Sequence, residues 1–315
     1  MLEYTDKIRA LSSQLLKEKK VDMVIGFRKG SRPMSNEPYM AKHPDEVKNL
    51  VWDSNCGINL TTYLTDRKEK IAVVAKGCDS RNITTHIIEN KIKRDQLVIL
   101  GVPCTGMIDR RKINNIVDFE INDVVEQGDT IVVKGETTET SFAKEQVLQK
   151  NCSVCTHRNP VLYDELIAPN VPELTDVDRY EDVRRVESMS IDDKWHHFDA
   201  LLSNCIRCYA CRNACPLCYC PTCFVDESKP QWVGKGDDPV DTKTFHFLRA
   251  YHCAGRCTDC GSCERACPMG INMREFTKKL EKDCQELFGR QAGLSLEERP
   301  PLDSFNPKDP DAFVK

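Results

Sequence analysis

Eight cysteines of this chain fall into two copies of one spacing that is typical of iron–sulfur ligation. The first copy is Cys205, Cys208, Cys211 and Cys215, before Pro216, and the second is Cys257, Cys260, Cys263 and Cys267, before Pro268. In two-cluster ferredoxins, three cysteines of such a motif hold one cubane and the fourth ligates the other cluster. We therefore predict two [4Fe-4S] clusters with crossed ligation. One is expected on Cys205, Cys208, Cys211 and Cys267, and the other on Cys257, Cys260, Cys263 and Cys215.

Other interpretations of these cysteines are weaker. Zinc sites rarely repeat a four-cysteine spacing. Disulfide frameworks are typical of short secreted chains without a core, whereas at least eight of the 18 cysteines here have metal-ligand spacing. Two adjacent cubanes conduct single electrons and perform no bond chemistry themselves, so the motifs indicate no catalytic residue.

Three further cysteines, Cys218, Cys220 and Cys223, follow the first motif and are needed by neither cluster. Cys220 and Cys223 form a Cys-x2-Cys pair, and Cys152 and Cys155 form another. Two such pairs can build a zinc or iron–sulfur site, although their separation is not that of a familiar zinc ribbon. These pairs predict a further metal centre.

Cys56, Cys78 and Cys104 are competing ligands for that third centre. Cys78 and Cys104 each follow a predicted parallel strand, and Cys56 begins a predicted helix. Strand carboxyl ends and helix N-termini lie at the ligand-binding edge of a parallel α/β sheet, and a helix N-terminus lowers the pKa of a thiol. Each cysteine alone could be a small buried apolar residue. Together they favour a third cluster, with Cys152 and Cys155 as its remaining ligands.

The turn that carries Cys78 has a second interpretation as an anion site. Lys76, Gly77, Asp79, Ser80 and Arg81 lie where a strand passes into a helix, and such a turn can hold the phosphate of a flavin or nucleotide. The chain has no G-x-G-x-x-G and no G-x-x-x-x-G-K-[ST] motif, which argues against nicotinamide and nucleoside triphosphate binding.

The elements that must position these residues alternate between strand and helix in the N-terminal half. Apolar stretches predict strands at 21–27, 70–76 and 96–102, and polar–apolar patterns predict helices at 5–20, 57–66 and 79–94. Buried strands separated by a helix indicate a parallel sheet. Edge strands are expected at 116–123 and 129–135, around Gly128, and further helices at 190–205 and 273–289.

These patterns predict an α/β N-terminal domain with a parallel sheet, joined to an α-rich, ferredoxin-like domain with two clusters. The expected limits are 1–150 for the α/β domain, 151–200 for a linker with Cys-x2-Cys, 201–290 for the two-cluster domain and 291–315 for an extended tail. A net charge of −4 gives no general attraction to nucleic acid. No run approaches the roughly 18 apolar residues of a membrane span, and no signal peptide is evident. We predict a cytoplasmic protein from an anaerobic host.

Three segments of the N-terminal half carry a family resemblance. KIAVVAKGCDSR (70–81), LGVPCTGM (100–107) and NCSVCTHRNP (151–160) resemble the beta-subunit family of deazaflavin-reducing hydrogenases and formate dehydrogenases. The two cysteine motifs resemble the dicluster modules of formate dehydrogenase beta subunits and heterodisulfide-reductase-associated proteins. The family resemblance implies an α/β domain that binds FAD beside a 4Fe-4S cluster. It implies a third-cluster role for Cys104, Cys152 and Cys155, with Cys56 or Cys78 as the fourth ligand.

One departure from the family bears on the substrate. Deazaflavin-reducing members commonly carry a cluster motif before the flavin domain, whereas the dicluster motifs here follow it. The expected function is an electron-transfer subunit of an anaerobic multi-subunit oxidoreductase. Its expected partners are a catalytic formate dehydrogenase or hydrogenase subunit, or a flavin-containing subunit like those of heterodisulfide reductases. The alternatives are a stand-alone flavin-dependent reductase fed by ferredoxin and a non-catalytic docking module.

Overall fold

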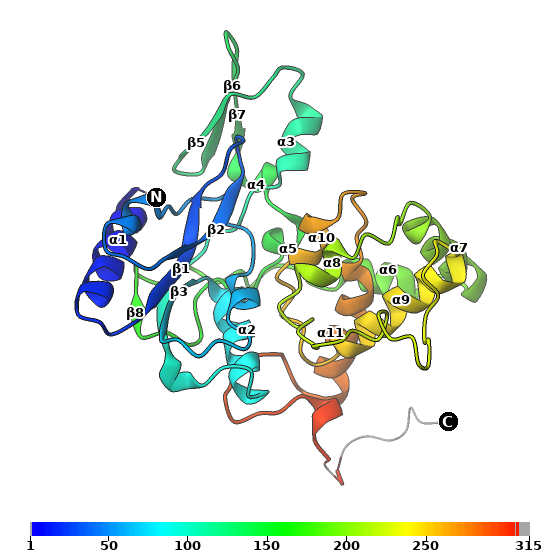
Figure 1. Cartoon of the computed structure of the whole chain (residues 1–315). Coiled ribbons are helices and arrows are strands. Elements are labelled where there is room, and N and C mark those ends of the chain that lie inside the picture. The colour runs from blue at the N-terminus through cyan, green and yellow to red at the C-terminus, as the bar shows by residue number, and fades with distance from the viewer. Residues whose placement is uncertain (1, 306, 309–315) are drawn as a thin grey trace. The chain divides into compact units, whose positions relative to one another are not determined.

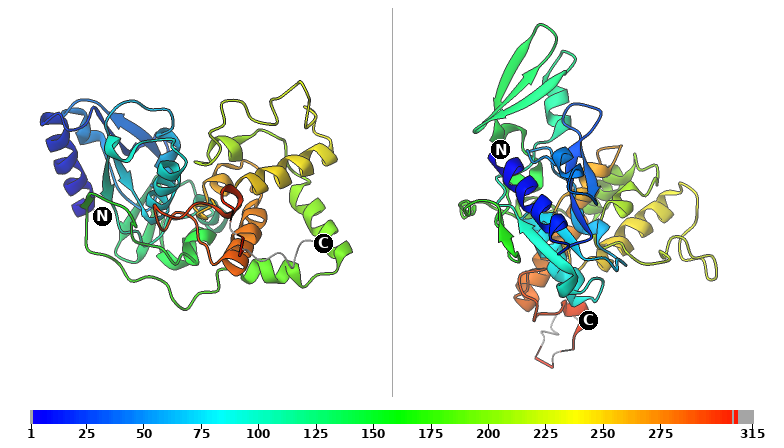
Figure 2. Two further views of the ribbon diagram at one scale, coloured as in Figure 1. Left: turned by 90° about the horizontal axis from the view of Figure 1, so that it is seen from below. Right: turned by 60° about the vertical axis from the view of Figure 1, so that its left-hand side comes forward.

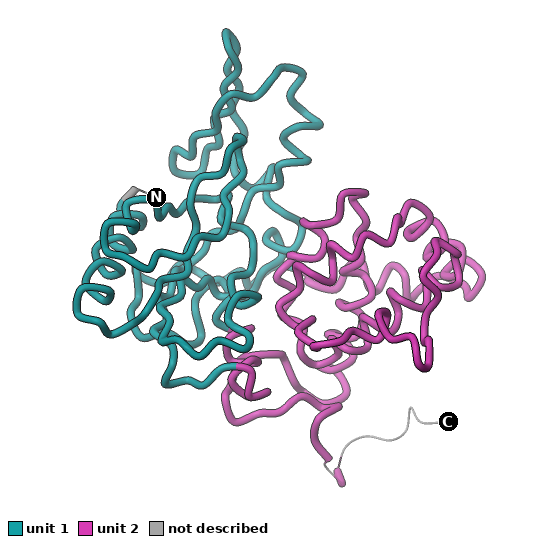
Figure 3. The backbone as a smooth tube through the Cα atoms, in the orientation of Figure 1, with its two compact units in different colours: residues 1–80, 92–177 teal, residues 81–91, 178–315 magenta. Residues whose placement is uncertain are grey.

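The computed structural model describes residues 2–305 and 307–308 and divides into two compact units, coloured separately in Figure 3. Unit 1 comprises residues 1–80 and 92–177, and unit 2 comprises residues 81–91 and 178–315. The predicted domain limits at 150, 200 and 290 stay a prediction. Residues 306 and 309–315 of the predicted tail lie outside the described residues, and the tail contains a 3-10 helix at Pro301–Asp303.

Unit 1 is built on a five-stranded sheet in the order β2-β1-β3-β4-β8 (Figure 1). Its strands are β1 (Met23–Lys29), β2 (Asn36–Ala41), β3 (Ile71–Ala75), β4 (Leu97–Gly101) and β8 (Glu165–Leu166). Strand β3 pairs in parallel with β1 and β4, and β4 pairs in parallel with β8, whereas β2 runs antiparallel to β1. This mostly parallel sheet confirms the predicted α/β fold of the N-terminal half.

Burial explains why the apolar strands were recognisable. All five residues of β3 are buried, as are the first five of β1, which is the pattern of strands covered on both faces. Helix α1 (Leu2–Lys17) lies along one face of the sheet (Figure 2) and buries Ile8 and Leu16. Helix α2 (Gly77–Ile88) begins two residues after β3 ends.

The helix predicted over 57–66 is wrong, because only a 3-10 helix, Leu60–Tyr63, forms there. The Asn59 side chain caps it by accepting a hydrogen bond from the Thr61 amide at 3.1 Å. The adjacent β-branched residues Thr61 and Thr62 lose side-chain freedom in a helix, which disfavours a longer one. Short 3-10 turns also occur at Glu46–Asn49 and Arg94–Gln96.

A separate antiparallel sheet is formed by β5 (Asp123–Gln127), β6 (Thr130–Lys134) and β7 (Glu139–Ala143). Gly128, with φ of 61°, makes the predicted turn between β5 and β6. The strand predicted at 116–123 is wrong, because helix α3 (Arg110–Ile116) ends there and β5 begins only at Asp123. The helices α4 (Lys144–Val147) and α5 (Lys150–Ser153) follow this sheet.

Unit 2 is helical. Its helices are α6 (Glu181–Glu187), α7 (Ile191–Leu202), α8 (Ala210–Asn213), α9 (Pro239–His252), α10 (Ser262–Ala266) and α11 (Arg274–Phe288). The predicted helices at 190–205 and 273–289 correspond to α7 and α11. Helix α9 was not predicted; it begins at Pro239, and the Asp238 side chain accepts hydrogen bonds from two amides of its first turn. Helices α9 and α11 lie side by side (Figure 2).

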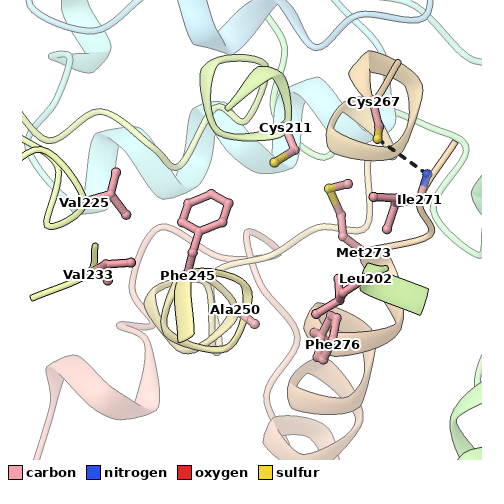
Figure 4. Close-up of a cluster of buried hydrophobic side chains, with 10 residues drawn as sticks. All are labelled: Leu202, Cys211, Val225, Val233, Phe245, Ala250, Cys267, Ile271, Met273 and Phe276. Carbon is pink, nitrogen blue, oxygen red and sulfur yellow. Dashed lines mark hydrogen bonds between the residues drawn. The ribbon is translucent and has the colours of Figure 1, made fainter. Parts of the chain in front are cut away.

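The core of unit 2 joins these helices to the cysteine motifs, as Figure 4 shows. Phe245 of α9 and Phe276 of α11 pack in the same cluster as Cys211 and Cys267, which come from different motifs. The Ile271 amide donates a hydrogen bond to the Cys267 Sγ at 3.4 Å, drawn as a dashed line. Cysteine side chains are thus part of the core of unit 2.

Candidate iron–sulfur site

The two cysteine motifs share one backbone conformation. Between the first and second cysteines, Arg207 and Asp259 occupy equivalent positions and have φ of 48° and 55°. Between the second and third cysteines, Tyr209 and Gly261 also correspond, with φ of 59° and 74°. Left-handed backbone is unfavourable for residues other than glycine. Its repetition at matched positions indicates that both loops are curled for the same purpose.

The curled loops direct backbone N–H groups at cysteine sulfur. The Asp259 amide donates to the Cys257 Sγ at 3.4 Å. At the equivalent place in the first motif, the Arg207 backbone donates to Cys205 and lowers the pKa of that thiol, against the larger opposite effect of burial. Such bonds stabilise sulfur that carries negative charge, as a cluster ligand does. The third cysteine of each motif, Cys211 or Cys263, lies in a short helix, α8 or α10.

The structure brings together the four cysteines predicted for the first cluster. One small cavity is lined by Cys205, Cys208, Cys211 and Cys267. Cys267 belongs to the second motif, so this grouping matches crossed ligation. Burial raises the pKa of Cys211 to about 12; Arg249 lowers it, whereas the nearby Cys263, Cys205 and Cys267 raise it.

Pairwise electrostatic interactions link the cysteines predicted for the second cluster. Burial raises the pKa of Cys263 to about 12, which Arg249 opposes and which Cys215 and Cys260 reinforce. Burial likewise raises the pKa of Cys257, and Cys260 adds to that effect. Cys215, from the first motif, therefore interacts with Cys263 of the second. Metal binding would deprotonate all of these thiols.

The trailing cysteines lie against the second set and around a further cavity. Hydrogen bonds from Cys215 and Cys253 lower the pKa of Cys218 to about 3. The cavity is lined by Cys218, Cys220 and Cys223, together with Arg212, Arg249 and Arg256. The Arg212 side chain is hydrogen-bonded to Cys223 and pairs with Asp226 at 2.8 Å. Arginine side chains and thiols therefore line the same cavity.

Two side chains of α9 that sequence analysis missed contact the cysteine motifs. The His246 Nε2 lies 3.3 Å from the Cys205 Sγ, and the Arg249 Nη2 donates to the Cys211 carbonyl oxygen at 3.1 Å. They are three residues apart and so share a helix face. Burial lowers the pKa of His246 to about 4, which keeps the ring neutral near pH 7. The only signal in the sequence was polar residues interrupting an apolar pattern just before the second motif.

In unit 1, three of the predicted ligands are neighbours. Burial raises the pKa of Cys104 to about 12, and Cys152 and Cys155 are among the charges that raise it. The Gly106 amide donates to the Cys104 Sγ at 3.4 Å, the same two-residue relationship that Asp259 has with Cys257. Gly106 has φ of 105°, and a Cβ there would lie 3.3 Å from the Cβ of Cys152. A glycine therefore permits the close approach of these two segments.

Cys78 and Cys56, the candidates for a fourth ligand, differ in their surroundings. Cys78 lies near Lys76, whose pKa it helps to raise. Cys56 is fully buried, and its sulfur accepts hydrogen bonds from the Asn36 side chain at 3.3 Å and the Asp53 amide at 3.4 Å. Burial raises the pKa of Cys56 to about 12. The Cys56 sulfur is thus already engaged by protein donors.

The predicted anion-binding residues are occupied by internal contacts. The Lys76 Nζ pairs with Asp79 at 2.8 Å, and the Ser80 hydroxyl donates to the Gly77 carbonyl and accepts from the Val161 amide. The Arg81 Nε donates to the Ala292 carbonyl at 2.9 Å. A Cβ on Gly77 would lie 2.3 Å from the His157 carbonyl oxygen, so a backbone segment covers this turn.

Two further observations concern the described part of the chain. Within residues 2–305 and 307–308, no three cysteine, histidine or acidic side chains converge as they would on one metal ion. None of the helices in those residues has the length and apolar character needed to cross a membrane.

The segment that contains the two cysteine motifs matches a known domain family. Residues 201–271 match the model of the 4Fe-4S dicluster domain. The beta subunit of the F420-dependent formate dehydrogenase of Methanocaldococcus jannaschii is 25% identical, over 94% of this chain and 93% of that protein. The beta subunit of F420-dependent formate dehydrogenase 1 of Methanococcus maripaludis is 24% identical, over 94% and 92%.

A solved chain of the F420-reducing [NiFe] hydrogenase complex from Methanosarcina barkeri aligns with 50% of this chain and 62% of its own length. Its identity is 14% and its TM-score is 0.39. The formate dehydrogenase relatives and the dicluster match confirm the predicted resemblance and the predicted class of iron–sulfur electron-transfer subunits. The chain therefore carries a 4Fe-4S dicluster domain within a sequence similar, along nearly its whole length, to formate dehydrogenase beta subunits.

Proposed function

We propose that this chain is the electron-transfer subunit of a formate dehydrogenase. Two [4Fe-4S] clusters, on the crossed cysteine sets, would carry single electrons between a catalytic partner subunit and an acceptor bound to unit 1. The observation that carries this proposal is the grouping of Cys205, Cys208 and Cys211 around one cavity with Cys267 from the other motif. The matched left-handed backbone of the two loops supports it.

We further propose a third cluster on unit 1, with Cys104, Cys152 and Cys155 as ligands and Cys78 as the fourth. The shared neighbourhood of the first three supports this assignment. Cys78 is favoured over Cys56 because the Cys56 sulfur is engaged by Asn36 and Asp53. The competing proposal pairs Cys152 and Cys155 with Cys220 and Cys223.

A flavin is proposed from the family resemblance. A bound FAD would exchange single electrons with the clusters and two electrons with its substrate. Because Lys76, Asp79, Ser80 and Arg81 are engaged internally and the backbone at 157–159 covers Gly77, we expect the flavin to contact other parts of unit 1.

Metal and flavin content test these proposals together. The chain is purified anaerobically, and iron, acid-labile sulfide and flavin are measured per chain. About eight irons would fit two clusters and about twelve would fit three, since each cubane holds four. A chain without iron would refute the electron-transfer function, and eight irons without flavin would refute both the third cluster and the flavin.

Co-purification with a formate dehydrogenase catalytic subunit tests the partner. In the complex, formate is expected to bleach the cluster absorbance of this chain, because the catalytic subunit feeds the clusters. A monomer that reduces its acceptor with ferredoxin alone would instead support a stand-alone reductase. A complex whose clusters formate does not reduce would support a docking module.

A further inference from the structure

Arg249 is a buried cation that faces cysteine sulfur rather than carboxylate. Its side chain belongs to a residue only 3% exposed, and its Nη2 donates to the Cys211 carbonyl oxygen at 3.1 Å. Its Nε has no hydrogen-bond partner, and no ion pair to a carboxylate forms with it in the part of the chain that the structure describes. A guanidinium buried in this way is unfavourable unless an anion lies close to it.

The cysteines that act on Arg249 include members of both predicted ligand sets, and outside those sets Cys253 and Cys218, the latter hydrogen-bonded to Arg249. Arg249 lowers the pKa of Cys211, which belongs to the first set, and of Cys215 and Cys263, which belong to the second. Burial lowers the pKa of Arg249 itself, but Cys215 and Cys263 raise it, and the net pKa lies well above its ordinary value. The guanidinium is therefore placed where it acts on both sets.

Two other buried cations of the chain are paired with carboxylates. Arg274 pairs with Asp259 at 2.6 Å and with Glu264 at 2.9 Å. In unit 1, Lys76 pairs with Asp79 at 2.8 Å. Arg249, by contrast, faces thiols in place of a carboxylate: it is hydrogen-bonded to Cys218 and interacts with Cys211, Cys215 and Cys263 of the two predicted sets.

On the basis of the two-cluster function proposed above, we propose that Arg249 is the shared counter-ion of both clusters and raises the reduction potential of each. A cubane with four thiolate ligands carries negative charge, and reduction adds one electron without forming or breaking a bond. A fixed cation nearby therefore stabilises the reduced form more than the oxidised form. In a water-poor site this effect is screened little.

The test compares reduction potentials of loaded chains. Wild type, R249Q and R249K are purified anaerobically, their iron and sulfide are counted, and both clusters are titrated with dithionite while electron paramagnetic resonance is recorded. The matched control is K243Q, on the same helix, because the Lys243 charge is already paired with Asp199 at 2.6 Å.

We expect R249Q to keep its clusters and to shift both midpoint potentials to more negative values. R249K, which retains the charge, should remain close to wild type, and K243Q should be unchanged. Unaltered potentials in R249Q, or an equal shift in R249Q and R249K, would overturn the counter-ion role.

If R249Q loses iron, the iron content of R249Q and R249K tests the counter-ion role in place of the potentials. Iron kept by R249K but lost by R249Q supports a required positive charge, whereas equal loss in both refutes it. The iron content of the wild type separates this inference from the function on which it rests. Wild-type clusters with unresponsive potentials refute the inference alone, and an iron-free wild type refutes both.

Discussion

The His246 ring and the Cys205 thiol face each other, with 3.3 Å between Nε2 and Sγ. Because burial lowers the pKa of His246 to about 4, the ring is neutral near pH 7, and the tautomer that carries its proton on Nε2 would donate to a deprotonated ligand sulfur. A donor on a ligand sulfur raises the potential of its cluster. H246F should therefore lower the potential of the first cluster and leave the second nearly unchanged. H196Q is the control, because His196 is exposed. Equal shifts of the potentials of both clusters in H246F would contradict a specific effect on the first cluster.

Crossed ligation predicts which double variants lose iron together. C205S should lose about four irons, one cubane, and C205S/C267S should lose no more, because both residues serve the same cluster. C205S/C215S should lose about eight irons. The opposite ranking of the two double variants would show that each motif holds its own cluster. C284S is the control, because Cys284 lies in α11 outside both cysteine sets.

The trailing pair can be tested by alkylation of the loaded chain. If Cys220 and Cys223 bind metal with Cys152 and Cys155, all four should resist iodoacetamide until iron is removed. Cys220 is exposed, so its protection could not come from burial. Rapid modification of Cys220 and Cys223, with Cys152 and Cys155 still protected, would leave the third centre to the cysteines of unit 1. Mass spectrometry of the peptides reads out each site.

We expect the ion pairs of Arg274 to contribute strongly to the stability of unit 2. R274M removes the cation that lies 2.6 Å from buried Asp259 and leaves Lys278 farther away, at 3.5 Å, so we expect a loss of about 3–5 kcal/mol in stability. Hydrogen exchange of α11 measures the loss within unit 2. R184Q is the comparison, because Arg184 and Asp178 are half exposed, and its effect should stay below about 1 kcal/mol. Equal effects would contradict the burial argument.

Removing the clusters should unfold the cysteine loops selectively. Helices α8 and α10 have four and five residues, too few to be stable without tertiary support. After iron is removed anaerobically, segments 205–215 and 257–267 should exchange amide hydrogens rapidly, whereas β3 and β4 should stay protected. Unchanged exchange in both loops would show that they fold without metal.

The sequence was informative where the signal is local. Continuous apolar runs predicted β3 and β4, and regular cysteine spacing predicted the 4Fe-4S dicluster domain; of the two crossed ligand sets, which stay a prediction, the cysteines of the first line one cavity. Prediction from the sequence failed where contacts between residues distant in the sequence determine the structure. Helix α9 buries Thr242, His246 and Arg249 on the face that a surface helix would make apolar. His246 and Arg249 are buried there against Cys205 and Cys211, and no periodicity in the sequence reveals those contacts.

The placement of His246 and Arg249 on α9 separates two properties of the chain. The predicted cysteine ligands lie in segments 205–215 and 257–267. The two polar side chains that we expect to influence the reduction potentials lie on α9, between those segments in the sequence. Substitutions at these two positions would adapt the same electron-transfer subunit to donors and acceptors of different reduction potential, with no change in its metal-binding loops. Related chains that serve different redox partners should accordingly vary at these positions while keeping every ligand cysteine.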